Sequence, residues 1–273
     1  KILIETLSIP ITSILGISLA IPGAVNDRQH KIIYSPSLTW ENIIIPKHFE
    51  GLPTLPLFLE NDANACAIYE NWLGVCRGIN DFVCLVHTTG IGAGVFVNGR
   101  LYRGTDGVSA QIGHIQVNEN GPLCACGNFG CLEVMAGHDY GVKKFTQSIR
   151  QGITTVSGIE KIEDININTL HREAQNGNDI AMNILEESAT YLGVGISILL
   201  NILNPTVIVL GKGFDNFPKH LIHLINKVVE NKVMRIYKSN INIISSNATN
   251  SSVALGAAII PIKPIFGEET DLC

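Results

Sequence analysis

Four side chains suited to binding a metal ion lie within 18 residues of one another: His114, Cys124, Cys126 and Cys131. Zinc in proteins prefers a tetrahedral set of sulfur and nitrogen ligands, and a closed set of four protein ligands is structural rather than catalytic. Two glycines between Cys126 and Cys131 allow the tight backbone turns that converging thiolates need. The alternatives are ordinary loop cysteines or a redox pair, and the density of ligands favours a structural zinc ion.

Polar residues flank this zinc loop, residues 114–131. Gln111 and His114 lie at its start, and Glu133 follows it directly. A loop folded around a metal ion would hold such side chains in fixed positions. Fixed donors and acceptors suit recognition of a polyhydroxylated ligand, so Gln111, His114 and Glu133 are candidate ligand contacts.

A carboxylate follows an expected strand in the first third of the chain. Asp62 lies where strand 55–59 gives way to helix 63–73, and ligand sites of α/β folds favour the carboxyl ends of strands. A carboxylate there could accept the proton of a sugar hydroxyl, as general bases do in phosphoryl transfer. Asn and Asp are also common helix N-caps, and from this motif alone the two interpretations are evenly matched.

Glycines recur between two further expected strands, 81–87 and 94–98. A turn over residues 89–94 containing Gly90, Gly92 and Gly94 could present backbone N–H groups to phosphates. A glycine-rich turn that only joins two strands is at least as good an interpretation.

Strand-like and helix-like segments alternate along the chain, which predicts an α/β protein with mixed sheets. The other expected strands are 14–21, 206–210 and 241–245, and the other expected helices are 179–201, 218–232 and 252–260. Helix 179–201 is apolar enough to be core or interface, and core is the favoured interpretation.

The composition is that of a globular protein, with 46% hydrophobic and 16% charged residues. A net charge of −5 argues against binding DNA or an anionic membrane by this part alone. No apolar run reaches the roughly 18 residues of a membrane span. Seven cysteines without a signal peptide indicate a reducing compartment, the cytoplasm, and Cys66, Cys76 and Cys84 are expected to be inert core thiols.

Together these segments resemble the ROK family, which groups bacterial sugar kinases with sugar-responsive transcriptional repressors. The most specific match is Gly113-His114 followed by the cysteine motif that ends in Leu132-Glu133. Supporting matches are Pro22-Gly23, residues 60–65, the glycines at 90, 92 and 94, and residues 204–211. The resemblance covers the chain from about Ile14 to its end.

The resemblance implies an actin-like ATPase fold (ribonuclease H-like) with two lobes and a zinc-binding loop. Residues 1–110 would form the remainder of the N-terminal lobe and the start of the C-terminal lobe, and residues 111–273 the rest. Asn61, Asp62, Gln111, His114 and Glu133 would contact sugar hydroxyls. In a kinase, Asp62 would be the catalytic base, Gly90, Gly92 and Gly94 would bind phosphate, and ATP and Mg²⁺ would be cofactors beside the structural Zn²⁺.

Several departures favour a repressor over a kinase. Gln111 replaces the Glu that is usual in family kinases, Thr88 and Ala93 replace glycines of the phosphate turn, and Ser37 replaces an Asn. The family's N-terminal phosphate loop is absent, and the chain, which begins at Lys1, is interpreted as part of a longer protein. The expected function is therefore the sugar-sensing domain of a repressor that binds a hexose, N-acetylhexosamine or related sugar (or its phosphate). DNA would be bound by a missing N-terminal domain, and the protein would form a homodimer or tetramer away from membranes. The intact Asn61-Asp62 pair keeps an ATP-dependent sugar kinase as the alternative.

Overall fold

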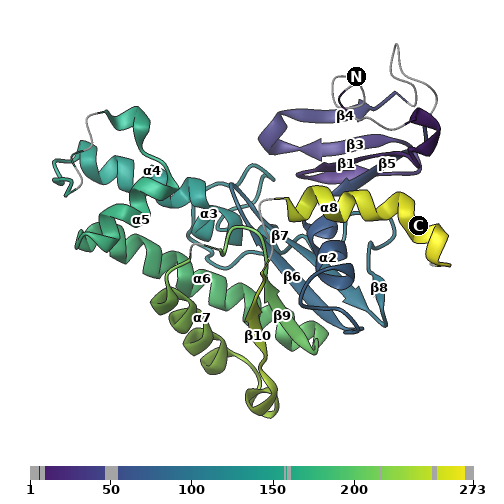
Figure 1. Cartoon of the computed structure of the whole chain (residues 1–273). Coiled ribbons are helices and arrows are strands. Elements are labelled where there is room, and N and C mark those ends of the chain that lie inside the picture. The colour runs from purple at the N-terminus through teal and green to yellow at the C-terminus, as the bar shows by residue number, and fades with distance from the viewer. Residues whose placement is uncertain are drawn as a thin grey trace. The chain divides into compact units, whose positions relative to one another are not determined.

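The computed structural model of the chain describes residues 6, 10–46, 55–156, 158, 161–215, 217–247 and 251–267. Its contacts divide the chain into two compact units (Figure 1). The first unit comprises residues 1–84, 93–110 and 246–273, and the second comprises residues 85–92 and 111–245. The two units are discontinuous in sequence because the last helix packs in the first unit, and the lobe boundaries expected at residues 110 and 111 remain a prediction.

The first unit contains two small sheets. Strand β1 (Ile17–Ile21) pairs in parallel with β5 (Leu57–Asn61), and β2 (Ala24–Asn26), β3 (Lys31–Ser35) and β4 (Trp40–Ile44) form an antiparallel sheet in that order. Strand β1 ends where Pro22-Gly23 begins, and Gly23 has a φ of 126°, which favours glycine. Buried Ile21, Val25, Ile32 and Leu59 form a core beneath these strands.

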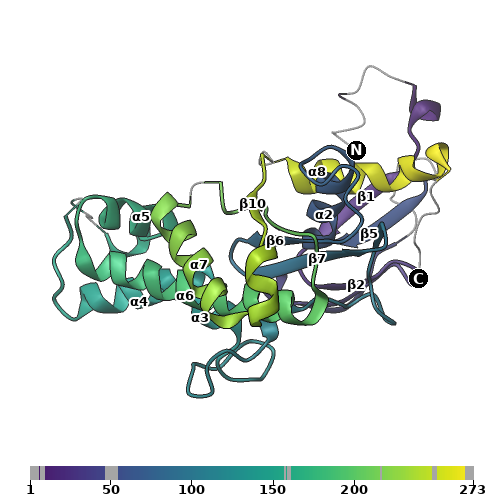
Figure 2. The same cartoon turned by 90° about the horizontal axis from the view of Figure 1, so that it is seen from below.

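Two helices of the first unit pack side by side, α2 (Asp62–Trp72) and α8 (Ser252–Ile259) (Figures 1 and 2). A Cβ at Gly256 would lie 1.8 Å from the backbone oxygen of Ala65, so the helices meet through their backbones. This close packing explains why the C-terminal segment belongs to the first unit.

A five-stranded sheet has the order β10-β9-β6-β7-β8. Its strands are β6 (Phe82–His87), β7 (Ile91–Val97), β8 (Arg100–Leu101), β9 (Val207–Leu210) and β10 (Ile243–Ser245). Every residue of β6 is buried, as expected for a central strand. The chain passes from one unit to the other within β6, between Cys84 and Leu85, and within β7, between Gly92 and Ala93.

The second unit is mainly helical and is built around α6 (Asp179–Leu203), which Asn178 caps by accepting hydrogen bonds from Ile180 and Ala181. Gly193 allows α6 to approach Val228 of α7 (Lys219–Lys232) closely. The other helices are α3 (Leu132–Ala136), α4 (His138–Arg150) and α5 (Ile167–Gln175). Helix α6 buries 12 of its 25 residues in the core of this unit, whereas Ile202 near its end is 71% exposed.

The expected elements are confirmed in type, with boundaries that shift by a few residues. The largest correction concerns the turn expected over residues 89–94. Strand β7 already begins at Ile91, so Gly92 and Gly94 are strand residues. The physical reason is packing, since a Cβ at Gly94 would lie 2.5 Å from Cβ of Ala67 on α2.

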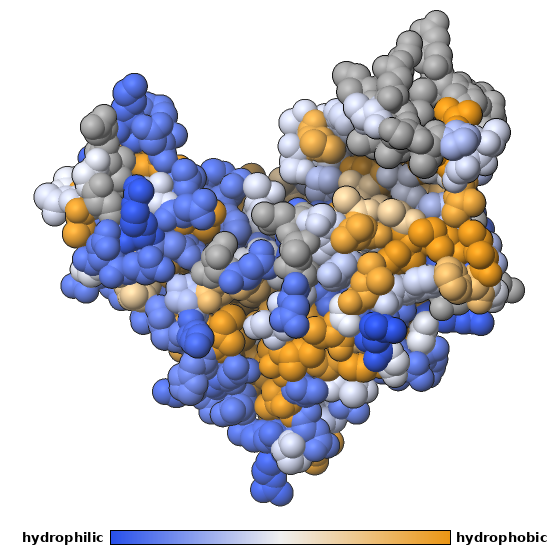
Figure 3. All heavy atoms as spheres, viewed as in Figure 1, coloured by the Kyte–Doolittle hydropathy of each residue, from blue (hydrophilic) through white to orange (hydrophobic). Residues whose placement is uncertain are grey.

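On the face seen in Figure 3, apolar residues gather over α8 and the 3-10 helix Ile260–Phe266 that follows it. Leu255, Ile265 and Phe266 are the large exposed apolar side chains of these elements, and Phe266 packs edge-on against Trp72 with ring centroids 5.5 Å apart. Within the described part of the chain, no helix combines the length and apolar character that a membrane span needs.

Candidate functional site

The four expected metal ligands converge in the second unit. One ligand atom from each of His114, Cys124, Cys126 and Cys131 lies within 4.8 Å of the others. Sγ of Cys124 lies 3.6 Å from Nδ1 of His114, and Sγ of Cys126 lies 3.6 Å from Sγ of Cys131. The distance between the two sulfurs is too long for a disulfide bond, and the three cysteines of the cluster form no disulfide.

The backbone around the cluster is bent by glycines and short hydrogen bonds. Gly127 closes a turn by donating its N–H to the carbonyl of Cys124 at a φ of 93°. Gly130 has a φ of 61°, and a Cβ there would lie 1.6 Å from the carbonyl oxygen of Asn118. No other residue fits at position 130 without moving the backbone, so the loop geometry depends on this glycine.

The donor set fits zinc. With Zn–S bonds of about 2.3 Å, two sulfurs of a tetrahedral site lie about 3.8 Å apart, close to the 3.6 Å between Cys126 and Cys131. Burial and the neighbouring thiols raise the pKa of Cys131 to about 12, so a cation is needed to hold it as the thiolate. The four residues therefore form a candidate structural zinc site.

Two candidate ligand contacts lie next to this cluster. His114 directs Nδ1 at Cys124, which leaves its Nε2 for another partner. Glu133 lies in the first turn of α3, two residues after Cys131, and its Oε2 accepts a hydrogen bond from the N–H of Ile91 at 3.2 Å. A Cβ at Gly90 would lie 2.3 Å from that oxygen, so Gly90 makes room for the Glu133 carboxylate.

Gln111 is exposed and begins the 3-10 turn Ile112–His114, where its carbonyl accepts the N–H of His114. The turn packs tightly, since a Cβ at Gly113 would lie 2.3 Å from the carbonyl oxygen of Ile91. Gln111, His114 and Glu133 thus belong to one compact unit, together with Gly90 and Gly92.

The other two candidate contacts belong to the first unit, at the junction of β5 and α2. Asn61 is the N-cap of α2, because its Oδ1 accepts from Ala63 N and Asn64 N. Its Nδ2 donates to the carbonyl of Gly23 at 2.9 Å and to Oδ1 of Asp62 at 3.2 Å. Asp62 is the first residue of the helix, and its Oδ1 also accepts the N–H of Ala63 at 3.0 Å, so both side chains contribute to the cap.

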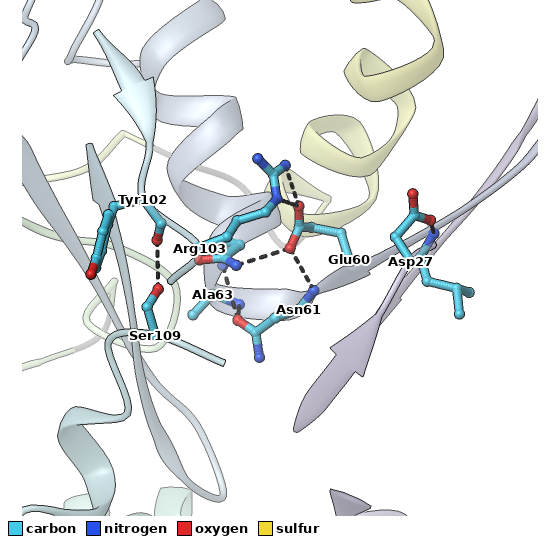
Figure 4. Close-up of polar contacts among 9 residues, drawn as sticks. Asp27, Glu60, Asn61, Ala63, Tyr102, Arg103 and Ser109 are labelled. Carbon is cyan, nitrogen blue, oxygen red and sulfur yellow. Dashed lines mark hydrogen bonds and ion pairs between the residues drawn. The ribbon is translucent and has the colours of Figure 1, made fainter. Parts of the chain in front are cut away.

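A buried ion pair supports this junction. Arg103 donates through Nε and Nη2 to Oε2 of Glu60, at 3.2 and 2.7 Å. The other oxygen of Glu60 accepts from Asn61 N and from Nδ2 of Asn64, both at 2.9 Å. Figure 4 shows Glu60 between Arg103 and Asn61. The side chains of Arg103 and Glu60 are 13% and 5% exposed, so the carboxylate depends on these partners.

Asp27 lies near this ion pair, at one side of a polar pocket of about 210 Å³ that Glu60, Arg103 and Asp106 also line. Its Oδ1 accepts the N–H of Leu59 at 2.5 Å, and Figure 4 shows Asp27 to the right of Glu60. Burial raises the pKa of Asp27. The sequence did not single out Asp27 or Arg103, because neither belongs to a motif.

Three histidines that the sequence also left unassigned line a small cavity in the second unit: His87, His138 and His171. His87 is 2% exposed, and its ring meets that of His138 at a centroid distance of 4.4 Å. Burial, with His138 nearby, lowers the pKa of His87 to about 3, and burial lowers the pKa of His138 to about 4. Both are therefore neutral at pH 7. Burial also lowers the pKa of His171.

The chain matches the ROK family over residues 2–263 and belongs to it. It is 32% identical to the xylose repressor of Bacillus spizizenii over 251 residues, which cover 92% of this chain and 62% of that protein. The N-acetylglucosamine repressor of Escherichia coli O6:H1 is 29% identical over 89% of this chain and 59% of its own length. The chain thus spans about three fifths of the length of these relatives.

Solved structures of both functional branches share the fold. A ROK family transcriptional regulator described as a homologue of Escherichia coli MLC has a TM-score of 0.79 at 27% identity, covering 90% of this chain and 62% of that one. A ROK family glucokinase from Streptomyces griseus, in complex with glucose and AMPPNP, also has a TM-score of 0.79, at 25% identity, covering 89% and 80%. The α/β, actin-like fold expected from the sequence is confirmed.

Proposed function

We propose that this chain is the sugar-sensing part of a ROK-family transcriptional repressor. The observation that carries the proposal is its similarity to xylose and N-acetylglucosamine repressors over about nine tenths of its length. In such a protein the sugar favours one of two conformations, and the conformation sets the affinity for DNA. DNA contact would belong to a further segment, consistent with the net charge of −5 of this one.

The proposed sugar contacts are Asn61 and Asp62 in the first unit and Gln111, His114 and Glu133 in the second. Amide, imidazole and carboxylate groups of this kind bind hydroxyls by donating and accepting hydrogen bonds. The proposed ligand is a pentose, hexose, N-acetylhexosamine or a phosphate of one of these. The zinc ion, bound by His114 and the three cysteines, would fix His114 and the start of α3.

The alternative function is an ATP-dependent sugar kinase with Asp62 as general base. It is favoured by one observation: Asn61 caps the helix and donates a hydrogen bond to Oδ1 of Asp62, which holds a carboxylate at the junction of β5 and α2. In that case Gly90, Gly92 and Gly94 would bind phosphate, with Mg²⁺ bridging the phosphates of ATP. Thr88 and Ala93, in place of glycines, argue against it.

A ligand screen with a coupled ATPase assay distinguishes the two. The complete protein is heated with xylose, glucose, N-acetylglucosamine, N-acetylmannosamine and their phosphates. A sugar that raises the melting temperature without ADP release supports the sensor, and Asp62→Asn should abolish the rise while the exposed-site control Asp215→Asn keeps it. Sugar-dependent ADP release that Asp62→Asn abolishes would make the protein a kinase instead.

A further inference from the structure

Helix α3 carries Glu133 but is too short to hold its own orientation. It has five residues, Leu132–Ala136, and helices of this length depend on contacts for their stability. Its first end follows Cys131, a member of the zinc cluster. The zinc site therefore fixes only one end, and the orientation of Glu133 also depends on what holds the other.

The other end is held by two buried donors. The carbonyl oxygen of Ala136 accepts from Nε2 of His87 at 2.8 Å and from Oγ of Ser188 at 2.7 Å. His87 ends β6 and is 2% exposed, while Ser188 lies on α6 and is 7% exposed. Two donors on one carbonyl at the last turn of a helix satisfy a group that the helix itself leaves without a partner.

The segment that follows His87 contacts α3 again. Ile91 N–H donates to Oε2 of Glu133, and Gly90 leaves room for that oxygen. A Cβ at Gly137, just past the helix, would lie 3.1 Å from the carbonyl oxygen of Thr89. The segment 87–91 is thus hydrogen-bonded to α3 at two places. His87 contacts the carbonyl of Ala136, and Ile91 contacts the carboxylate of Glu133.

His87 is itself held in one state. Because its Nε2 faces a carbonyl, that nitrogen carries the proton. The rings of Phe214 and Phe217 also pack against it, with centroids 5.3 and 5.6 Å from its own. A ring enclosed on these sides offers its N–H in one direction.

We propose that His87, assisted by Ser188, is a positioning residue that orients Glu133 through the end of α3. The inference rests on the proposed function in one respect, that Glu133 contacts the sugar. It adds a residue that touches neither sugar nor zinc but sets the direction of a sugar-binding carboxylate.

The test is a double-mutant cycle on the complete protein, with titrations of xylose and of N-acetylglucosamine. His87→Leu removes the donor to Ala136 and should weaken sugar binding about tenfold, nearly as much as Glu133→Gln. The double variant should bind no more weakly than Glu133→Gln alone, since both changes remove the same contact. His87→Gln, whose amide N–H can reach the carbonyl, should restore most of the affinity.

Full affinity in His87→Leu, or effects that multiply in the double variant, would overturn the inference. Ile225→Val on α7 controls for a general loss of core stability and should leave the affinity unchanged. If His87→Leu does not fold, Ser188→Ala removes the second donor to the same carbonyl and enters the same cycle.

Hydrogen exchange at the amide of Ile91 gives a readout that needs no sugar. Exchange should accelerate in His87→Leu, because the Glu133 carboxylate no longer accepts that N–H, and it should recover in His87→Gln. Unchanged exchange would contradict the inference. Failure of every sugar to bind the wild type would instead contradict the proposed function, so the two failures are distinct.

Discussion

The two groups of proposed sugar contacts are held in place by different physical means. In the first unit, Asn61 and Asp62 lie at a regular strand–helix junction, where a helix cap and a buried ion pair fix the backbone. In the second unit, His114 and Glu133 lie on a short turn and a five-residue helix, held by the metal cluster and by glycine contacts. A regular helix or strand positions its side chains through its backbone hydrogen bonds. A short turn or a five-residue helix lacks enough of these bonds, so metal ligation and close contacts with other segments must hold it in place.

The comparison predicts that metal loss affects the second unit first. Cys126→Ser removes one of four ligands and should lose the zinc, about one ion per chain, together with several kcal/mol of stability, because metal binding contributes directly to folding. Metal analysis and thermal unfolding measure both effects. Cys76→Ala, a buried thiol of the first unit, is the control and should keep the zinc. A wild-type protein that is well folded without zinc would contradict the prediction that the second unit depends on the metal for its stability.

The first unit should be sensitive to charge instead. Arg103→Met leaves the Glu60 carboxylate buried without its cation, which costs about 3–5 kcal/mol when a buried pair is broken. Chemical denaturation measures the loss, and the zinc content should not change. Adding Glu60→Gln should recover part of the stability, since the uncompensated charge is gone. No recovery would mean that packing of Arg103, rather than charge, supports the junction.

The histidine cavity makes the second unit sensitive to acid. The pKa values of His87 and His138 are lowered to about 3 and about 4, against about 6.5 in an unfolded chain. Below pH 6.5 the unfolded state binds more protons than the folded one, so stability falls as the pH drops towards 4. Buried His87 alone contributes a slope of roughly 1 kcal/mol per pH unit over this range.

His138→Phe tests this acid sensitivity, since it keeps a ring beside His87 and removes one titrating group. The slope of unfolding free energy between pH 6.5 and 4 should become shallower than in the wild type. Equal slopes would mean that His138 contributes nothing to the acid sensitivity, and that it comes from groups both proteins share, such as His87 and the zinc ligands.

The smallest effects on stability should come from Gly90. A Cβ at Gly90 meets the end of the flexible Glu133 side chain, so Gly90→Ala should cost no more than about 1 kcal/mol while it weakens sugar binding. Gly94→Ala is the matched variant, because its Cβ would meet Ala67 and the carbonyl oxygen of Ala63 on α2. It should destabilise the protein by about 1–3 kcal/mol. The reverse order of stabilities would contradict the different packing of the two glycines.

The sequence predicted what is encoded locally. The four residues predicted to bind zinc do converge in the structure, and they could be recognised because they lie close together along the chain. The start of α2 could be predicted from the residue types that commonly cap helices. The turn at 89–94 was wrong in extent, because glycine was interpreted as a turn residue when Gly94 instead permits contact with a helix. The roles proposed for individual sugar contacts remain predictions.

Contacts between distant residues could not be predicted. Glu60 and Arg103 are separated by 43 residues, and His87 and Ala136 by 49. Each pairing depends on where strands and helices meet in the folded chain, and a lone Arg or His gives no sign of its partner. Asp27 escaped notice for the same reason, since its partner is the backbone of Leu59.

The interleaving of the two units determines how the protein can be divided in the laboratory. The chain crosses between units four times, at 84/85, 92/93, 110/111 and 245/246. A single cut therefore cannot release either unit as an uninterrupted polypeptide. A fragment ending at residue 110 would lack α8 and expose the surface of α2 that Gly256 contacts. Co-expression of residues 246–273 with that fragment, or a linker joining them in one chain, brings all segments of the first unit together, along with residues 85–92 of the second.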